Sequence, residues 1–253
     1  MGGRLGKRLM VIMPHPDDEC FGCGATMARY AAEGVTVSLV TMTRGGGGLW
    51  QAHDAGDLRR LTDVREVELR RAADLLGVTF LELFDYPDGA LERVEEVPEV
   101  RARFCSDIVR CIRAHRPQVV VTFGPEGGYG HPDHRMLHRM VVEATPQAGD
   151  PDHYPAQLRA VGISAFRPHK LYFQAASAGT VAELKLPAQP PVTTRIEVSA
   201  YVEHKRRAFA CHRSQAQEWE PLDAFIAGDE THELFSLAGA PARLEETDLF
   251  AGL

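Results

Sequence analysis

The chain has 253 residues, of which 44% are hydrophobic and 25% charged, a balance typical of a folded globular protein rather than a disordered one. Its 28 basic and 35 acidic side chains give a formal net charge of -7 without a long basic run, which argues against a nucleic-acid partner. Five scattered cysteines do not suit a disulfide framework, and the longest early apolar run, 9–13, is too short for a signal peptide or a membrane span. We therefore expect a cytoplasmic protein without a membrane span.

Strands and helices alternate along the first 145 residues. Apolar or β-branched runs predict strands at 8–13, 35–43, 78–84 and 118–124. Helix formers that end at glycine or proline predict helices at 25–34, 62–77, 97–117 and 134–145. This alternation predicts an α/β, Rossmann-like fold, in which a mostly parallel sheet carries helices on both faces.

The remaining residues predict a less regular C-terminal part. Residues 146–169 and 177–195 are rich in proline, alanine and glycine, whereas 170–176 and 195–201 are typical of strands and 201–215 of a helix. The glycine-rich run 44–57 has no periodicity and predicts a mobile surface loop. Because the sequence contains no internal repeat and no obvious linker between these parts, we expect one domain over residues 1–253.

Acidic and histidine residues follow two of the predicted strands. "PHPDDE" (14–19) comes directly after the first strand, and "GGYGHPDH" (127–134) follows the fourth. In an open parallel sheet, binding sites form at the carboxyl ends of the strands, so these two remote segments are expected to meet. Clustered carboxylates beside a histidine are costly unless a cation neutralises them.

The ligand types narrow the choice of metal. Two imidazoles and one carboxylate, with one open coordination place, are typical of catalytic zinc, and the same set suits Fe2+ or Mn2+. A metal of this kind lowers the pKa of bound water and polarises a carbonyl. The doublet of Asp17 and Asp18 supplies one ligand and one spare carboxylate that can act as a general base.

With these motifs the chain resembles the PIG-L/LmbE-like family of zinc-dependent N-deacetylases, which includes the deacetylases of mycothiol and bacillithiol biosynthesis. Two further stretches share the resemblance: "REVELRRAADLLGV" (65–78) and "KRRAFACHRSQ" (205–215). Four such pieces in the same order form a specific signal, and they span most of the chain.

The resemblance implies a role for each matching residue. The zinc ligands would be His15, Asp18 and His134. Asp17 would be the general base, and His131 would steady the tetrahedral oxyanion while Asp133 orients it by a hydrogen bond. Tyr129 matches a tyrosine that assists catalysis, and the substrate contacts would be Arg65, Trp50 and His212.

The implied reaction is removal of an N-acetyl group from an N-acetylglucosamine-type small molecule, by attack of a zinc-bound water on the amide carbonyl. The partner would therefore be a small amino-sugar substrate, and the family's tendency to associate leaves a homo-oligomer open. One departure concerns the substrate. The family commonly carries a Gly-Glu pair after the second strand, where this chain has "TRGGGGLWQ", with Trp50 and His53 as candidates for the sugar contact.

Two other functions compete with the deacetylase hypothesis. An amidase that cleaves a larger acyl group, of the thiol-conjugate amidase type, would be favoured by a roomy pocket near Trp50 and the loop 146–169. A non-catalytic sugar- or nucleotide-binding Rossmann-like module is the other. The lack of GxGxxG after the first strand argues against dinucleotide binding, and the aspartate doublet argues against a dead enzyme.

Structural alternatives also exist for single residues. Asp17 or Asp18 could cap the helix that follows, and Asp133 could cap its own helix. Arg65 and Glu68 are spaced as a helix-surface ion pair. His138 shares a helix face with His134 and so competes as a ligand, and His212 could cap a helix end.

Overall fold

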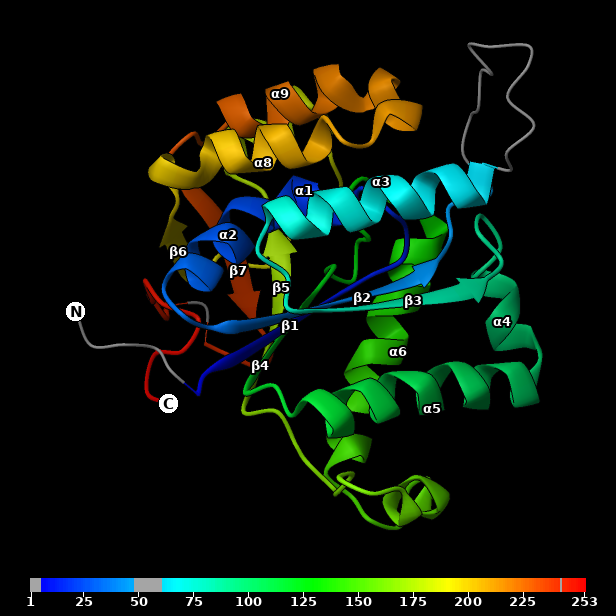
Figure 1. The fold of residues 1–253 in the computed structure, drawn as a ribbon. Coiled ribbons are helices and arrows are strands. Elements are labelled where there is room, and N and C mark those ends of the chain that lie inside the picture. The colour runs from blue at the N-terminus through cyan, green and yellow to red at the C-terminus, as the bar shows by residue number, and fades with distance from the viewer. Residues whose placement is uncertain (1–5, 48–60, 242) are drawn as a thin grey trace.

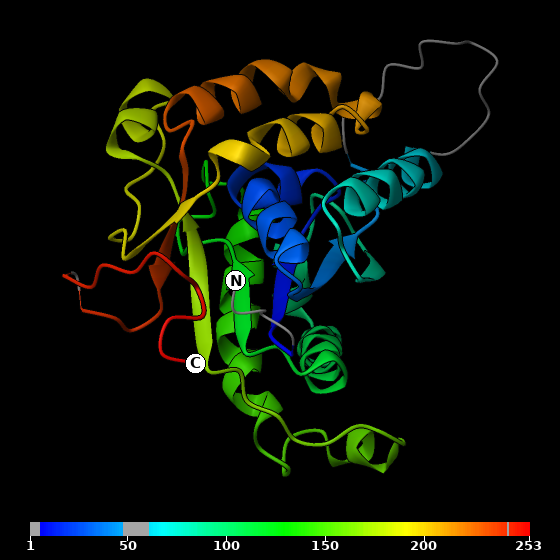
Figure 2. The same ribbon diagram turned by 60° about the vertical axis from the view of Figure 1, so that its left-hand side comes forward.

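The computed structural model describes residues 6–47, 61–241 and 243–253. Within these ranges, a seven-stranded sheet in the order β3-β2-β1-β4-β5-β7-β6 runs through the middle of the molecule (Figures 1 and 2). The strands are β1 (Arg8–Met13), β2 (Thr36–Thr43), β3 (Phe80–Tyr86), β4 (Val119–Thr122), β5 (Lys170–Ala175), β6 (Thr194–Glu197) and β7 (His232–Leu237). Strands β1 to β5 pair in parallel, and β7 pairs antiparallel with both β5 and β6.

Helices cover both faces of the sheet, as Figure 1 shows. One face carries α1 (Asp18–Gly22), α2 (Gly24–Ala32), α3 (Leu61–Leu75), α8 (Val202–Phe209) and α9 (Trp219–Ala227). The other face carries α4 (Glu92–Glu96), α5 (Pro98–His115) and α6 (Pro132–Ala148). The short segments are α7 (Ala178–Glu183) and three 3-10 turns, η1 (Pro155–Arg159), η2 (Ser199–Tyr201) and η3 (Arg213–Glu218). The predicted α/β fold with a mostly parallel sheet is therefore confirmed.

Two apolar clusters explain why the first strand has no polar face. Leu9 and Val11 pack with α2, α3 and α8 in one cluster, whereas Met10 and Ile12 pack with α5 and α6 in the other. Successive side chains of a strand point to opposite faces, so a strand covered on both sides needs a continuous apolar run.

The C-terminal part departs from the predicted elements. The strand expected at 195–201 ends at Glu197, and the helix expected at 201–215 ends at Phe209. Neither α9 nor β7 was expected from the sequence. Pro221 suggests a break in "WEPLDAFIA", but it lies in the first turn of α9, where a missing N–H does no harm.

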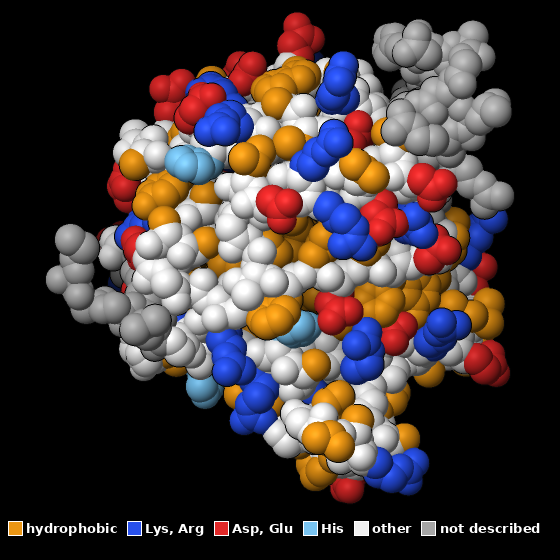
Figure 3. Space-filling model, viewed as in Figure 1, with side chains coloured by type: hydrophobic (Ala, Val, Ile, Leu, Met, Phe, Trp, Pro, Cys, Tyr) orange, Lys and Arg blue, Asp and Glu red, His pale blue; other side chains and the backbone are white. Residues whose placement is uncertain are grey.

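Most of the predicted loop 44–57 lies outside the described residues, and so does Trp50. No helix in the described part of the chain combines the length and the apolar character needed to cross a membrane. Basic and acidic side chains are interspersed on the face drawn in Figure 3. The prediction of a single domain over residues 1–253 stays a prediction.

Candidate metal centre and active site

The two motifs meet because β1 and β4 are neighbours in the sheet. These strands pair in parallel, with Leu9 opposite Val119 and Val11 opposite Val121. The segments that follow the two strands therefore leave the sheet at the same edge. The segment after β1 enters α1, and the segment after β4 enters α6. As a result the rings of His15 and His134 lie with their centroids 5.3 Å apart, although the residues are remote in the chain.

His15, Asp18 and His134 bring their ligand atoms together in a buried cluster. One donor atom from each lies within 4.8 Å of the other two. Nδ1 of His15 is 3.2 Å from one carboxylate oxygen of Asp18, and Nε2 of His134 is 3.5 Å from the other. Both ring nitrogens of His134 are buried without a hydrogen-bond partner among the described residues, an arrangement that an isolated imidazole would not favour.

The charges in the cluster suit a cation. Burial lowers the pKa of His134 to about 4, so its ring is neutral and has a lone pair to offer. Burial alone would raise the pKa of Asp18, but the facing rings of His134 and His15 lower it to about 2. Two imidazoles and an ionised carboxylate form a donor set that zinc, Fe2+ or Mn2+ accepts, so these residues fit a divalent metal.

Two acids orient His15 from its other nitrogen. Nε2 of His15 lies 3.1 Å from Asp133 Oδ2 and 2.9 Å from Asp88 Oδ1. Burial lowers the pKa of His15, but the hydrogen bonds to Asp133, Asp18 and Asp88 outweigh it and raise the pKa above its usual value. A carboxylate behind a ligating histidine fixes its tautomer and ring direction. Asp88 was not predicted, although an acid two residues after a strand end, in "FDYPDG", is the kind of signal that marked the other two segments.

Asp17 stands beside the cluster in an unusual backbone conformation. Its φ is 112°, a value that residues other than glycine rarely adopt. Its carboxylate accepts a hydrogen bond of 3.1 Å from Arg65, which also donates to the carbonyl oxygens of Pro16 and Gly45. Burial raises the pKa of Asp17 to about 7, although Arg65 lowers it.

The structure also tests two structural alternatives, helix capping by Asp17 or Asp18 and the ion pair of Arg65 with Glu68. Asp17 occupies the N-cap position of α1, but its side chain makes no capping hydrogen bond, and Oδ2 of Asp18 accepts from the backbone N–H of His15 instead. Arg65 is directed to Asp17, whereas Glu68 accepts hydrogen bonds from the backbone N–H and the hydroxyl of Ser214. The alternative of a helix-surface pair between Arg65 and Glu68 is therefore not seen, because Arg65 makes a buried contact and Glu68 a partly buried one.

His131 and Asp133 open helix α6 in a way that differs from the expectation. His131 is the N-cap, and its Nδ1 accepts a 3.2 Å hydrogen bond from the backbone N–H of Asp133. The Asp133 carboxylate instead accepts from the N–H groups of Gly89 and Leu91 and contacts His15. Asp133 therefore contacts His131 through its backbone N–H and not through its carboxylate, because the carboxylate contacts His15. In neutral His131 this bond leaves the proton on Nε2.

Tyr129 and His138 both lie near the predicted ligand His134. Tyr129 is 65% exposed, and its ring centroid is 5.3 Å from that of His134. His138 directs Nδ1 to the carbonyl oxygen of Phe123, 3.0 Å away, and does not join the cluster.

His212 is buried behind the site and not on its surface. Its Nε2 lies 2.6 Å from Oε1 of Glu19, and Oε2 of Glu19 accepts the backbone N–H of Asp17. His212 is 1% exposed and is not among the residues that line the cavity. Its expected contact with substrate is thus replaced by a contact that supports Asp17, because the turn after α8 packs beneath α1.

A cavity of about 550 Å³ opens over the cluster. Of the predicted site residues, those that line it are His15, Asp17, Asp18, Arg65, Tyr129, His131 and His134. The described lining includes no residue from the loop 146–169, where a roomy pocket had been expected for the amidase alternative.

Comparisons with known proteins agree with this geometry. The family model described as "PIG-L: GlcNAc-PI de-N-acetylase" matches residues 10–145. A 1D-myo-inositol 2-acetamido-2-deoxy-alpha-D-glucopyranoside deacetylase from Thermobifida fusca (strain YX) is 36% identical over 284 residues, which cover 97% of this chain and 99% of that protein.

Two solved structures share the fold. N,N'-diacetylchitobiose deacetylase from Pyrococcus horikoshii has a TM-score of 0.72 at 25% identity, over 93% of this chain and 84% of that one. GalB, the 4-carboxy-2-hydroxymuconate hydratase from Pseudomonas putida KT2440, has a TM-score of 0.70 at 17% identity, over 93% and 97%. The second likeness shows the fold alone, since a hydratase and a deacetylase share it. The family match and the full-length identity to the first relative show that the chain belongs to the PIG-L family of de-N-acetylases, as its motifs predicted.

Proposed function

We propose that this protein is a metal-dependent hydrolase that removes the N-acetyl group from an N-acetylglucosamine-type small molecule. The observation that carries the proposal is the convergence of His15, Asp18 and His134 beside Asp17, a carboxylate that lines the same cavity outside this ligand set. The names of the deacetylases from Thermobifida fusca and Pyrococcus horikoshii both specify an acetylated amino sugar, which supports this substrate class.

The proposed cofactor is zinc, held by His15, Asp18 and His134, with Fe2+ and Mn2+ as metals that suit the same donors. When bound, such a metal polarises the amide carbonyl and lowers the pKa of water. The cytoplasmic location stays a prediction, and a homo-oligomer stays open.

The chain's own residues supply the proton transfers. Asp17, held by Arg65, is positioned to take a proton from the attacking water. His131 lines the cavity with its ring centroid 4.7 Å from that of His134, and its Nε2–H is the hydrogen-bond donor we assign to the carbonyl oxygen. The proton that Asp17 takes from the water is the one we assign to the leaving amine. Tyr129 stands at the exposed side of both rings and is assigned to the rim of the site.

Acetate release from a panel of N-acetylated sugars, measured with the zinc-loaded protein, tests the proposal. Asp17→Asn is expected to keep the metal and to lose roughly 10²–10⁴-fold in hydrolysis, because the amide cannot accept the proton. Asp74→Asn, an exposed aspartate of α3, serves as the matched control and is expected to hydrolyse normally. Normal turnover by Asp17→Asn would show that Asp17 is not the general base.

A further inference from the structure

The cavity has two chemically different sides, with the metal centre between them. Over the ends of β2 and β3 its wall is polar, with Asp88, Arg65 and backbone groups at Gly47 and Gly89. Because β5 lies on the opposite side of β4, the segments that follow β5 form the other wall. The cluster of His15, Asp18 and His134, at the ends of β1 and β4, separates the two sides.

Apolar side chains predominate on the second side, although Gln174, Gln189, Gln215 and Glu218 from the same part of the chain also line the cavity. We call the apolar part the apolar wall, and it consists of Phe21, Ala175, Ala176, Leu184, Leu186, Pro221 and Phe225. Leu184, Leu186 and Phe225 are each partly exposed, so their side chains have apolar surface left to cover. With the exception of Phe21, these residues lie beyond 145, where the match to the family model ends. The wall is therefore a property of this chain's C-terminal part and not of the matched region.

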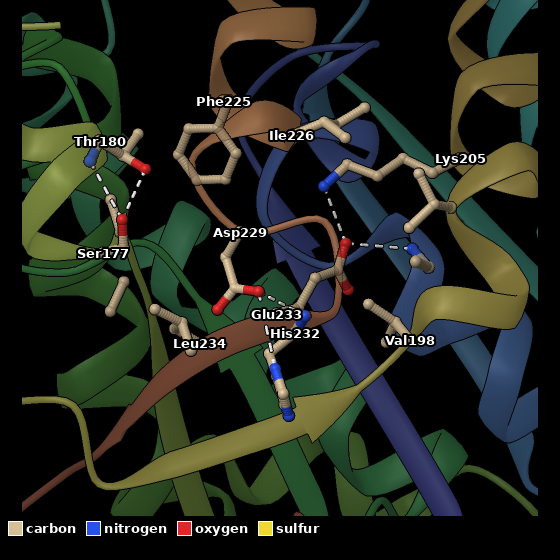
Figure 4. Close-up of a pocket in the computed structure, with 14 residues that line it drawn as sticks. Ser177, Thr180, Val198, Lys205, Phe225, Ile226, Asp229, His232, Glu233 and Leu234 are labelled. Carbon is tan, nitrogen blue, oxygen red and sulfur yellow. Dashed lines mark hydrogen bonds and ion pairs between the residues drawn. The ribbon is translucent and has the colours of Figure 1, made fainter. Parts of the chain in front are cut away.

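The apolar wall is held in a fixed shape. Ser177 caps α7 by accepting the N–H of Thr180, as Figure 4 shows. Its hydroxyl also donates to the carbonyl oxygen of Gly228 at the end of α9. A Cβ at Gly228 would lie 1.9 Å from Oγ1 of Thr180, so α7 and α9 approach as closely as glycine allows. A preformed apolar surface of this kind binds ligand without an ordering cost.

The two sides match the two halves of an amide substrate. The carbonyl carbon over the metal centre has the acyl chain on one side and the amine-bearing sugar on the other. Sugar hydroxyls need hydrogen-bond partners, which the polar side offers, and an acetyl group has only one methyl group to place against the apolar wall. We propose that the apolar wall is an acyl-binding site, and that the enzyme hydrolyses amino sugars with a linear N-acyl chain of several carbons as well as N-acetyl sugars, with a higher kcat/KM for the longer chains. This inference rests on the proposed function and names its substrate class.

An acyl-chain series tests the inference directly. Values of kcat/KM are measured for N-acetyl-, N-butyryl- and N-hexanoyl-glucosamine with the zinc-loaded full chain. Burial of each methylene against the wall is expected to raise kcat/KM about two- to fourfold. Leu184→Gln and Leu186→Gln are each expected to lower the hexanoyl-to-acetyl ratio at least fivefold. Leu158→Gln, in η1 and outside the cavity lining, is the matched control and keeps the wild-type ratio.

The outcomes separate this inference from the proposed function. A flat or falling series with normal acetate release overturns the acyl site and leaves the deacetylase. A second outcome is a kcat/KM that does not change with acyl length but is higher for octyl than for methyl N-acetylglucosaminide. It would show that the wall binds the aglycone, and it would also overturn the inference. No release from any substrate by the metal-loaded protein overturns both. If one leucine variant fails to fold, the other variant and the wild-type series still decide.

Discussion

At the scale of single residues, the strained backbone of Asp17 marks the centre of the site. A non-glycine residue at positive φ costs about 1–3 kcal/mol and persists only where its neighbours hold it. Here Glu19 accepts its N–H, Arg65 donates to its carboxylate, and His212 holds Glu19. The sequence singled out the residue as a candidate base, but it could not predict this conformation, because two of the three residues that hold it come from α3 and the turn after α8.

Asp88 is the acid that the sequence did not reveal. It shares Nε2 of His15 with Asp133, and an acid in this position typically strengthens metal binding 10- to 100-fold. We expect Asp88→Asn to weaken zinc affinity by about tenfold in a chelator competition assay. Asp85→Asn, which changes an exposed aspartate of β3, is the control and should bind zinc as the wild type does. Equal zinc affinities in the two variants would show that Asp88 does not strengthen metal binding.

Glu126 gives a prediction about stability and pH. Neither of its carboxylate oxygens has a well-formed hydrogen bond among the described residues, and burial raises the pKa of Glu126 more than the nearby backbone N–H groups of Glu126 and Gly128 lower it. A raised pKa in the folded state means that ionisation costs stability above that pKa, whereas below the ordinary value of 4.5 both states are protonated and the cost vanishes. We expect Glu126→Gln to raise the free energy of unfolding by about 1 kcal/mol at pH 8.

The same comparison provides its own control. The gain from Glu126→Gln should shrink as the pH falls toward 4, and Glu220→Gln, at an exposed position, should stay within about 0.5 kcal/mol of the wild type at both pH values. Urea unfolding curves measure all of these differences. A gain that persists unchanged at pH 4 would contradict the explanation by charge burial.

At the scale of elements, helix α2 depends on a strand that the sequence did not predict. Its own N-cap makes no side-chain hydrogen bond, and its first N–H groups, on Ala25 and Thr26, donate to Glu233 of β7. Lys205 of α8 pairs with the same carboxylate at 2.9 Å, with both side chains 4% exposed. The helical pattern of 25–34 is local and was predictable, whereas its cap lies more than 200 residues away.

The pair of Lys205 and Glu233 therefore matters for stability. Lys205→Met leaves a buried carboxylate without its counter-charge, and we expect a loss of about 3 kcal/mol in the free energy of unfolding. Arg206→Met, on the same helix, removes a surface pair with Asp223 and should cost at most about 1 kcal/mol. Urea unfolding of both variants is the measurement, and equal small losses would show that the buried pair contributes little.

At the scale of the whole molecule, the parallel half of the sheet was the predictable part. Strands β1, β2 and β4 are buried along almost their whole length because helices cover both of their faces, and parallel strands bring their carboxyl ends to one edge. That rule alone placed residues 15–18 next to residues 131–134. The antiparallel edge could not be predicted in the same way, because β7 inserts between β5 and β6 by pairing that no local pattern encodes.

The apolar wall illustrates the same limit. Its residues come from α1, the end of β5 and the residue after it, the segment that follows α7, and α9, and only the fold brings these short segments together. A roomy pocket near Trp50 and the loop 146–169 would have favoured the amidase alternative, but no described residue of that loop lines the cavity. Chemistry carried by one motif is thus easier to predict than a surface assembled from several elements.

The central claim is that His15, Asp18 and His134 hold one divalent metal ion between the two strand ends. Its most direct test is the metal content of purified protein after zinc loading and dialysis. We expect one equivalent per chain in the wild type and in His138→Ala, whose histidine contacts the carbonyl oxygen of Phe123 instead, and loss of the metal in His134→Ala. A full equivalent in His134→Ala would contradict the account.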